Sequence, residues 1–347
     1  MKSSAALKAL FSPWLWGRFF LVIAMLYWVV ARNGPQRIAQ ALLSVNPFWA
    51  CAAAAVFFAS IFGGAFQWYV LLRLQGIEYR LGACFRSYYS GMFLNNFLPG
   101  TVGGDALRVW DVHRSEQDLG KATAATLLDR LLGFSALSLF SLMALSYELN
   151  RRALPDALLK HLLWAVGTVT LCFALLLLVL LSRRVSVLIH ACIRLVGLKR
   201  LNTAYAKLQD SLFAYKSSWG KMSGVFAIAA SVQILRVAVH LFCAWSLGIS
   251  ISPSFFLTFI PLIALAAVLP LNVGGWGVPQ SLGTYLYSLP GILAPISGPT
   301  QGLDTGSAAT ALAFLPSVIG MVVMLGGGFY FIVGRKNRPT GGSHLVA

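Results

Sequence analysis

The sequence contains one seven-residue pattern twice, as Leu98-Pro99-Gly100-Thr101-Val102-Gly103-Gly104 and as Leu269-Pro270-Leu271-Asn272-Val273-Gly274-Gly275. The two copies agree at Leu, Pro, Val and both glycines without a gap, and each copy follows an apolar segment. Proline lacks a backbone donor and stops a helix, while paired glycines let the chain turn tightly. The repetition therefore predicts two apolar segments that are interrupted at equivalent points.

The rest of the chain is built for lipid. Hydrophobic residues make up 58% and charged residues only 11% of it, and the mean hydropathy is +0.75. Crossing a hydrocarbon core takes about 20 mostly apolar residues per helix. Six stretches meet this requirement most clearly: 14–31, 47–72, 125–147, 161–182, 222–247 and 307–334. We expect an all-α integral membrane protein, with one polytopic domain over residues 1–334 and a short, disordered cytoplasmic tail over 335–347.

The formal net charge of +17 does not indicate a nucleic-acid-binding protein, because the basic residues lie in loops between apolar segments. With both termini cytoplasmic, 21 of the lysines and arginines fall on the inside. Five fall outside: Arg32, Arg37, Arg151, Arg152 and Lys160. This bias follows the positive-inside rule and predicts a multi-pass protein of the cell inner membrane.

The same count places the two interrupted regions on opposite sides. Both flanks of Leu81–Leu98 are cytoplasmic, so this region should be a re-entrant helix that dips in and returns. Both flanks of Phe255–Leu289 are external, so it either dips from outside or crosses twice. We expect about eight transmembrane segments, with the two Gly/Pro-broken re-entrant elements related as an inverted repeat. The alternative is that the glycines only permit close crossing of helices.

Polar residues follow the first copy of the pattern. A helix that starts just after Gly103-Gly104 or Gly274-Gly275 would present its positive end to an anion such as a lipid phosphate. Asp105 is placed to be the N-cap of the first of these helices. Arg108, one turn later, either pairs with Asp105 or is free to hold a headgroup phosphate.

A charged residue also lies inside an apolar span. Arg236 is near the middle of 222–247, with Gln233 and His240 on the same helix face. A mid-span arginine faces the protein interior or a cavity by default, whereas a lone histidine is more often a satisfied core residue. Asp105 and Asp129 are the candidate partners of Arg236. Asp129 and Arg130 begin the span 125–147, where interfacial snorkelling is the simpler alternative.

One cytoplasmic segment predicts an amphipathic helix. From Lys199 to Lys216, apolar side chains recur at spacings of three and four opposite a basic face. Such a helix lies either on the anionic inner leaflet or on the protein's own cytoplasmic surface.

Signs of chemistry are few. The cysteines show no CxxC or metal-ligand spacing, and no hydrolase, zinc-protease or Walker pattern occurs. We expect no catalytic residue, metal or cofactor, and we consider enzymatic activity the weaker class.

Asn95-Asn96-Phe97-Leu98-Pro99-Gly100-Thr101-Val102-Gly103-Gly104-Asp105-Ala106-Leu107-Arg108 closely resembles the signature of the flippase-like transmembrane family. That family includes the membrane part of lysylphosphatidylglycerol synthase/flippase proteins. Leu128 to Gly133 resembles its next landmark, and Leu269-Pro270 through Gly277 resembles the third. After Gly277 the family typically carries an Arg-Glu pair, whereas this chain has Val278-Pro279-Gln280, so its second motif is uncharged. The resemblance covers about residues 10–335, and we expect this chain to lack the soluble aminoacyl-transferase domain of bifunctional members.

The resemblance implies translocation, or flipping, of a lipid, and the phosphate-binding argument above favours an anionic headgroup. Two alternatives stay open: a membrane-embedded lipid-modifying transferase that uses Asp105 or Asp129, and a non-transporting scaffold for an envelope-lipid synthase. The expected partners are a membrane lipid as substrate and a second copy of the chain or a lipid synthase. The expected cavity residues are Asn95, Asn96, Pro99, Gly103, Gly104, Asp105, Arg108, Asp129, Arg130, Arg236, His240, Pro270, Asn272, Gly274, Gly275 and Gln280.

Overall fold

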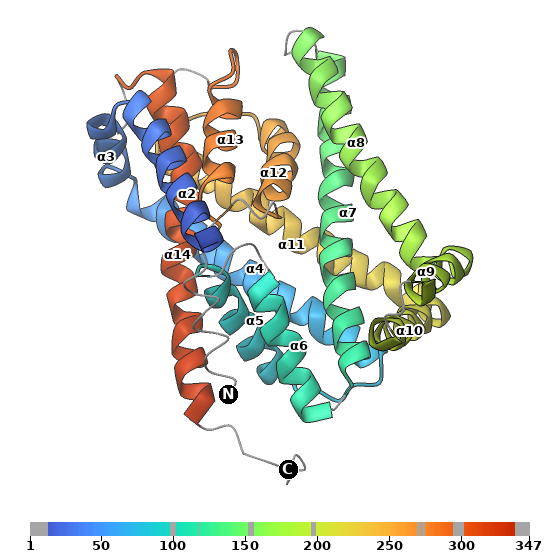
Figure 1. The fold of residues 1–347 in the computed structure, drawn as a ribbon. Helices are drawn as coiled ribbons and strands as arrows, with labels where there is room; N and C mark the ends of the chain where they lie inside the picture. Colours follow the sequence, from blue (N-terminus) through green and yellow to red (C-terminus); the bar gives the residue numbers. More distant parts are fainter. Residues whose placement is uncertain are drawn as a thin grey trace.

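The computed structural model describes residues 13–97, 102–116, 118–151, 156–195, 199–268, 272, 275–293 and 302–336. Within these ranges the chain forms thirteen α-helices and no strand, which confirms the all-α class (Figure 1). The helices are α2 (Pro13–Arg32), α3 (Pro35–Leu43), α4 (Pro47–Leu74), α5 (Leu81–Asn95), α6 (Val102–Glu116), α7 (Leu119–Arg151), α8 (Asp156–Leu181), α9 (Arg183–Leu195), α10 (Lys199–Ala214), α11 (Trp219–Ser246), α12 (Pro253–Val268), α13 (Val278–Tyr287) and α14 (Thr305–Lys336). A short 3-10 turn, η1 (Tyr215–Ser218), joins α10 to α11.

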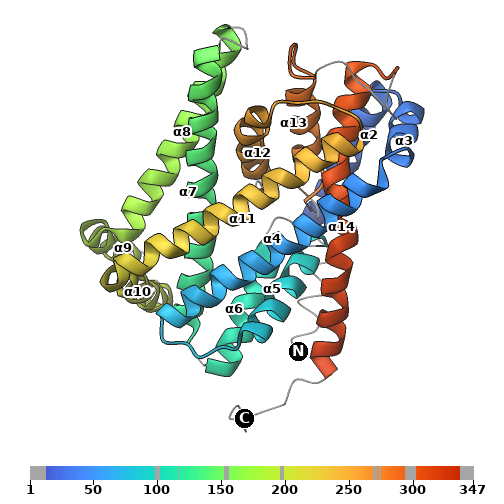
Figure 2. The ribbon, with the colours of Figure 1, turned by 180° about the vertical axis from the view of Figure 1, so that it is seen from behind.

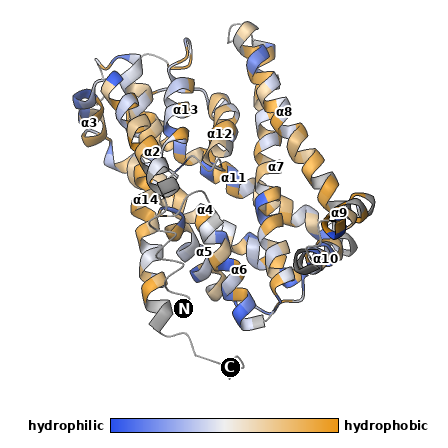
Figure 3. Ribbon diagram, in the orientation of Figure 1, coloured by the Kyte–Doolittle hydropathy of each residue, from blue (hydrophilic) through white to orange (hydrophobic). Residues whose placement is uncertain are grey.

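Five of these helices are long and apolar enough to cross a membrane: α4, α7, α8, α11 and α14. They coincide with five of the six clearest expected spans, and α2 corresponds to the sixth. Large apolar side chains such as Trp164 and Phe329 stand exposed on them, at 78% and 65% of their accessible area. The surface of α8 is hydrophobic along most of its length (Figure 3). Surfaces of this kind suit contact with lipid chains rather than water.

Two stretches of the chain have matching local structure. The helices α4 and α11 each contain 28 residues, and in each a glycine with positive φ follows the C-cap residue, Gly76 (74°) and Gly248 (69°). In both, the isoleucine that follows is buried and donates its N–H back into the last helical turn. This is the Schellman ending, which requires a left-handed residue that glycine adopts without strain. A 15-residue helix, α5, then follows α4, and a 16-residue helix, α12, follows α11.

The helices on either side of the two copies of the pattern lie far apart in space. The pair α5 and α6 is near one end of the molecule, and the pair α12 and α13 is near the other (Figures 1 and 2). Between them, α4 and α11 run side by side and cross the molecule obliquely, and α7 extends from one end to the other (Figure 2). The core of the fold is therefore bounded by the two long oblique helices, by α7 and by these two helix pairs.

We expected the first glycine pair to precede its helix, but the structure places both glycines inside that helix. The helix α6 already includes Val102, Gly103 and Gly104, and Asp105 lies in its first turn rather than at its N-cap. Gly104 faces α5 so closely that an added Cβ would lie 2.2 Å from the carbonyl oxygen of Gly91. Gly104 thus permits α5 and α6 to cross closely, which is the alternative interpretation of the glycines.

Replacing Gly104 by alanine is expected to destabilise the protein by about 1–3 kcal/mol, because the added methyl forces α5 and α6 apart. The measurement is thermal unfolding of the purified protein in detergent. The matched control is Gly82→Ala on α5, where an added Cβ meets nothing within 4 Å. Equal melting temperatures for the two variants would contradict the close packing of α5 on α6.

The amphipathic segment from Lys199 packs on the protein. Leu212 and Tyr215 are buried, and the Tyr215 hydroxyl donates to the backbone oxygen of Leu71 on α4 at 2.9 Å. The Gln75 amide donates to the backbone oxygen of Ser211 at 2.6 Å. Of the two interpretations left open by the sequence, the structure supports attachment to the protein's own surface.

Asp304 caps the N-terminus of α14 and ties it to α3. Its carboxylate accepts hydrogen bonds from the backbone N–H and hydroxyl of Ser307, and from Arg37 at 2.9 Å. The Ser307 hydroxyl, followed by Arg37, lowers the pKa of Asp304 to about 2. An aspartate in an unfolded chain titrates near 3.9. The stabilisation from this carboxylate is therefore complete above about pH 4 and is lost as the pH falls toward 2.

We expect Asp304→Asn to lower the melting temperature at neutral pH, and this deficit to shrink as the pH falls from about 4 to 2. Thermal unfolding of both proteins across this pH range is the measurement. A deficit that stays constant with pH would show that the ionised carboxylate is not what stabilises the helix start.

Candidate functional site

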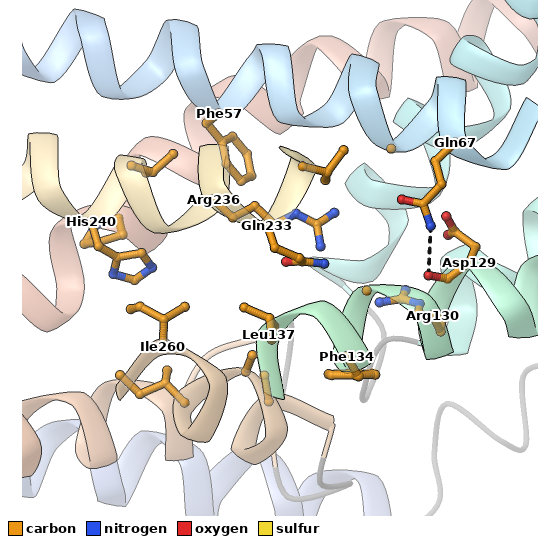
Figure 4. A pocket seen from close by; sticks show the side chains of 18 of the residues that line it. Phe57, Gln67, Asp129, Arg130, Phe134, Leu137, Gln233, Arg236, His240 and Ile260 are labelled. Carbon is orange, nitrogen blue, oxygen red and sulfur yellow. Dashed lines mark hydrogen bonds between the residues drawn. The ribbon is translucent and has the colours of Figure 1, made fainter. Parts of the chain in front are cut away.

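A cavity of about 290 Å³ lies between α4, α7, α11 and α12 (Figure 4). Its wall contains both polar and apolar side chains. The polar side chains come mainly from α4, α5, α7 and α11, through Gln67, Tyr88, Asp129, Arg130, Gln233, Arg236 and His240. The apolar side chains include Phe134 and Leu137 of α7 and Ile260, Ile263, Ala264 and Ala267 of α12. A cavity of this kind suits a ligand that itself carries both polar and apolar groups.

Four charged residues form one ion-pair cluster at the edge of the cavity. Arg108 donates to Asp105 at 2.6 Å and to Asp129 at 3.0 Å, and Arg130 donates to Asp105 at 2.9 Å. The Arg108 and Asp129 side chains are almost fully buried, with 4% and 6% of their area exposed. The cluster joins the start of α6 to α7. Arg108 is therefore not the free headgroup-binding cation that we considered, and Asp105 serves the cluster instead of capping a helix.

Tyr88 on α5 connects this cluster to the cavity. Its ring centroid lies 4.6 Å from the Arg108 guanidinium carbon, and its hydroxyl accepts a hydrogen bond from Arg236 at 3.3 Å. The first contact is a cation–π interaction. Arg108 makes a second one with Trp68, whose ring centroid lies 5.2 Å from the guanidinium carbon. The hydroxyl rests against the backbone of α4, where a Cβ on Gly64 would approach it to 2.4 Å. Tyr88 thus holds one side of the Arg236 guanidinium.

The expected partners of Arg236 are engaged elsewhere. Asp105 and Asp129 pair with Arg108 and Arg130, and no carboxylate of the described residues lies within 4.0 Å of Arg236. Two neighbouring polar atoms are buried without a protein partner: Oε1 of Gln233 and Nδ1 of His240. Gln233, Arg236 and His240 all project from α11 into the cavity (Figure 4). The mid-span polar stripe of the sequence is therefore one wall of the cavity.

Other expected cavity residues have local structural roles. The Asn95 side chain accepts from the N–H of Gly104 at 2.7 Å, and the Asn96 amide lies 3.6 Å from the sulfur of Met324. In the second motif, the buried Asn272 accepts from the N–H of Val278 and donates to the oxygen of Ala266. Gln280 accepts from the N–H of Gly277 and donates to Ser317.

These contacts close the turn between α12 and α13, so Asn272 and Gln280 do not line the cavity, and neither do Gly103, Gly104 and Gly275. Pro99, Pro270 and Gly274 lie outside the described residues. Of the expected set, Asp129, Arg130, Arg236 and His240 reach the cavity wall.

Two polar side chains of the cavity wall were not singled out from the sequence. Tyr88 lies in the segment interpreted only as a re-entrant element, and Gln67 is a lone amide in the otherwise apolar α4. The Gln67 amide donates to the backbone oxygen of Asp129 at 3.2 Å and so joins α4 to α7 beside the ion-pair cluster. The signal that was available is the rule used for Arg236, since polar side chains within apolar spans face protein. Across the described ranges, no group of three His, Cys, Asp or Glu side chains is placed to hold a metal ion.

Comparison with known proteins identifies one family and one curated relative. Residues 15–308 match the family described as "Lysylphosphatidylglycerol synthase TM region". The chain is 24% identical over 136 residues to the UPF0104 membrane protein PH1989 of Pyrococcus horikoshii. This alignment covers 38% of the chain and 39% of the relative, so the chain matches well under two thirds of that protein's length.

Proposed function

Because the chain belongs to the lysylphosphatidylglycerol synthase transmembrane-region family, we propose that it moves a lipid with an anionic, phosphate-containing headgroup across the bacterial inner membrane. The headgroup would enter the cavity, and the acyl chains would stay in the bilayer beside the apolar residues of α12. The polar side chains on the wall, together with the wholly apolar contribution of α12, support this arrangement.

Arg236 is the observation that carries the proposal. A charge at the centre of a spanning helix costs about 3 kcal/mol even on the most lenient insertion scale. Arg236 faces a cavity, has a phenol as its hydrogen-bond partner and has no carboxylate within 4.0 Å among the described residues. An anionic headgroup would supply the missing counter-charge, and guanidinium groups bind phosphate oxygens through paired hydrogen bonds.

The arrangement of helices supports alternating access to this site. The matched helices α4 and α11, their identical endings and the placement of the two helix pairs at opposite ends are what an inverted repeat would produce (Figure 1). We therefore propose one membrane domain over residues 1–334, with about eight spans, re-entrant broken helices and both termini cytoplasmic. The sequence has no Walker pattern, so movement would be passive or coupled to a gradient.

Reconstitution into vesicles tests the proposal. The purified protein is placed in liposomes that contain a trace of a phospholipid with a fluorophore on one acyl chain. A membrane-impermeant reductant then bleaches the outer-leaflet label. Bleaching of more than half of the label, at a rate that rises with the amount of protein, supports translocation. Bleaching that stops at the outer leaflet, as in protein-free vesicles, would refute it.

The transferase alternative lacks a favourable observation. It requires Asp105 or Asp129 as an acid or base, and both carboxylates are held in ion pairs with buried arginines. Mass spectrometry of the lipids after the same incubation separates the two functions. A covalently changed lipid would replace translocation by transfer as the proposed activity.

A further inference from the structure

The charges around the cavity add up to a single positive charge. The ion-pair cluster contains two arginines and two aspartates that satisfy one another, and it is neutral overall. Arg236 is one further cation, and among the described residues the wall contains no other aspartate, glutamate, lysine or arginine than Asp129 and Arg130 of the cluster. We infer that the site selects a headgroup with one net negative charge. The substrate is then a phosphodiester lipid whose headgroup carries no cationic group, rather than a phosphomonoester or a zwitterionic lipid. This inference rests on the proposed function and narrows its substrate.

The cluster does not offer its arginines to a ligand, because each of them already bonds a carboxylate. Arg108 contacts Asp105, Asp129, Trp68 and Tyr88, and its side chain is 4% exposed. Arg130 is bound to Asp105 through two of its nitrogens. Removing Arg108 would leave the Asp129 carboxylate unpaired in a medium of low dielectric constant, which is strongly unfavourable.

Arg236, in contrast, makes one hydrogen bond among the described residues, to Tyr88, and its other N–H donors remain available to a ligand. A guanidinium carries five N–H donors in a planar fork, and Arg236 uses one of its nitrogens to bond the Tyr88 hydroxyl. The remaining donors suit the two non-bridging oxygens of a phosphodiester, which share one negative charge. A phosphomonoester brings close to two negative charges, since its second pKa is near 6. Its second charge would be buried without a counter-ion.

The unpartnered atoms of Gln233 and His240 are two further polar groups on the cavity wall. Both residues lie on the face of α11 that carries Arg236, Gln233 one turn before it and His240 one turn after it. The Gln233 oxygen accepts a hydrogen bond and has no protein donor, so a headgroup substituent with an O–H or N–H group would satisfy it. The volume of about 290 Å³ is at the small end for ligand sites and suits a headgroup without its chains.

The test compares three lipids that share acyl chains and label and differ in headgroup charge. Phosphatidylglycerol is the monoanion, phosphatidylcholine the zwitterion and phosphatidic acid the dianion, with all assays at pH 8. Translocation is measured in vesicles, and binding is measured separately as retention of each lipid by protein purified in detergent. We expect phosphatidylglycerol to be moved and retained at least about tenfold better than the other two.

Variants that change the charge of the site sharpen the test. Asp105→Asn raises the net charge by one and is expected to shift preference toward phosphatidic acid. Arg236→Gln lowers it by one and is expected to abolish the preference for phosphatidylglycerol over phosphatidylcholine. Asp105 is the more accessible aspartate of the cluster, with 23% of its side chain exposed, and thermal unfolding checks that each variant is folded.

The outcomes separate the inference from the proposed function. Equal movement of all three lipids would leave translocation standing and overturn charge selection. Movement of none, with selective retention of phosphatidylglycerol, would refute translocation and support the charge-selective site. Retention of phosphatidic acid or phosphatidylcholine as strong as that of phosphatidylglycerol would overturn the inference whatever the transport result. Should Asp105→Asn fail to fold, the Arg236→Gln comparison decides alone.

Discussion

Replacing Arg108 by methionine is expected to destabilise the protein by about 3–5 kcal/mol, the usual loss when one partner of a buried ion pair is removed. Arg108 is the central member of the cluster, because it bonds both Asp105 and Asp129. Methionine fills similar space but leaves the Asp129 carboxylate buried with 6% of its side chain exposed. The loss also includes the two cation–π contacts with Trp68 and Tyr88. Unfolding of the purified protein in detergent gives the measurement.

Arg114→Met is the matched control, since Arg114 is an exposed arginine on the same helix, α6. It should change stability by less than about 0.5 kcal/mol, as surface substitutions usually do. The double variant Arg108→Met with Asp129→Leu should be more stable than the single Arg108 variant, because it removes the stranded charge as well. Equal stability of the two single variants would mean that the cluster does not hold α6 to α7.

Replacing Arg236 by alanine should have the opposite profile, a large loss of transport with no loss of stability. A hydrogen bond to a charged group contributes about 1.5–3 kcal/mol, which corresponds to a fall of about 10- to 100-fold in the translocation rate. The folded protein should be as stable as before or more so, because a charge at the centre of a span is removed. Vesicle bleaching measures the first quantity and unfolding in detergent the second.

Arg73→Ala serves as the control for this variant. Arg73 lies in the last turn of α4, away from the cavity, and bonds Tyr69 at 3.1 Å. Its removal should leave the translocation rate within a factor of two. An Arg236→Ala protein that folds and transports at the wild-type rate would remove Arg236 from the substrate site.

Much of the fold follows from sequence patterns that act over short distances. Apolar run length predicted the spans that became α4, α7, α8, α11 and α14, since one helix must satisfy its own backbone in lipid. The same argument could not decide where α6 begins. Gly103 and Gly104 were interpreted as a break, yet the approach of Gly104 to Gly91 of a neighbouring helix is a tertiary contact that one segment does not reveal.

The site was predictable in its chemistry and less so in its pairing. The free-energy cost of a charged side chain in the hydrocarbon core is enough to identify Arg236 as a residue that needs a polar environment. The helix α11 places His240 and Gln233 beside it. Which aspartate pairs with which arginine depends on how α6 and α7 pack. In the structure both carboxylates pair with Arg108 and not with Arg236. Tyr88 was missed because a tyrosine in an apolar helix is ordinary until its hydroxyl is seen to reach an arginine.

The single net positive charge of the cavity has an electrical consequence. An unoccupied site with one net positive charge experiences the transmembrane voltage, at about 2.3 kcal/mol per 100 mV for a charge that crosses the full field. Once a monoanion is bound, the site is neutral, and switching it from one side to the other displaces little net charge. The loaded step would then proceed at a rate insensitive to membrane potential, whereas the return of the empty carrier would be the step that voltage drives or opposes.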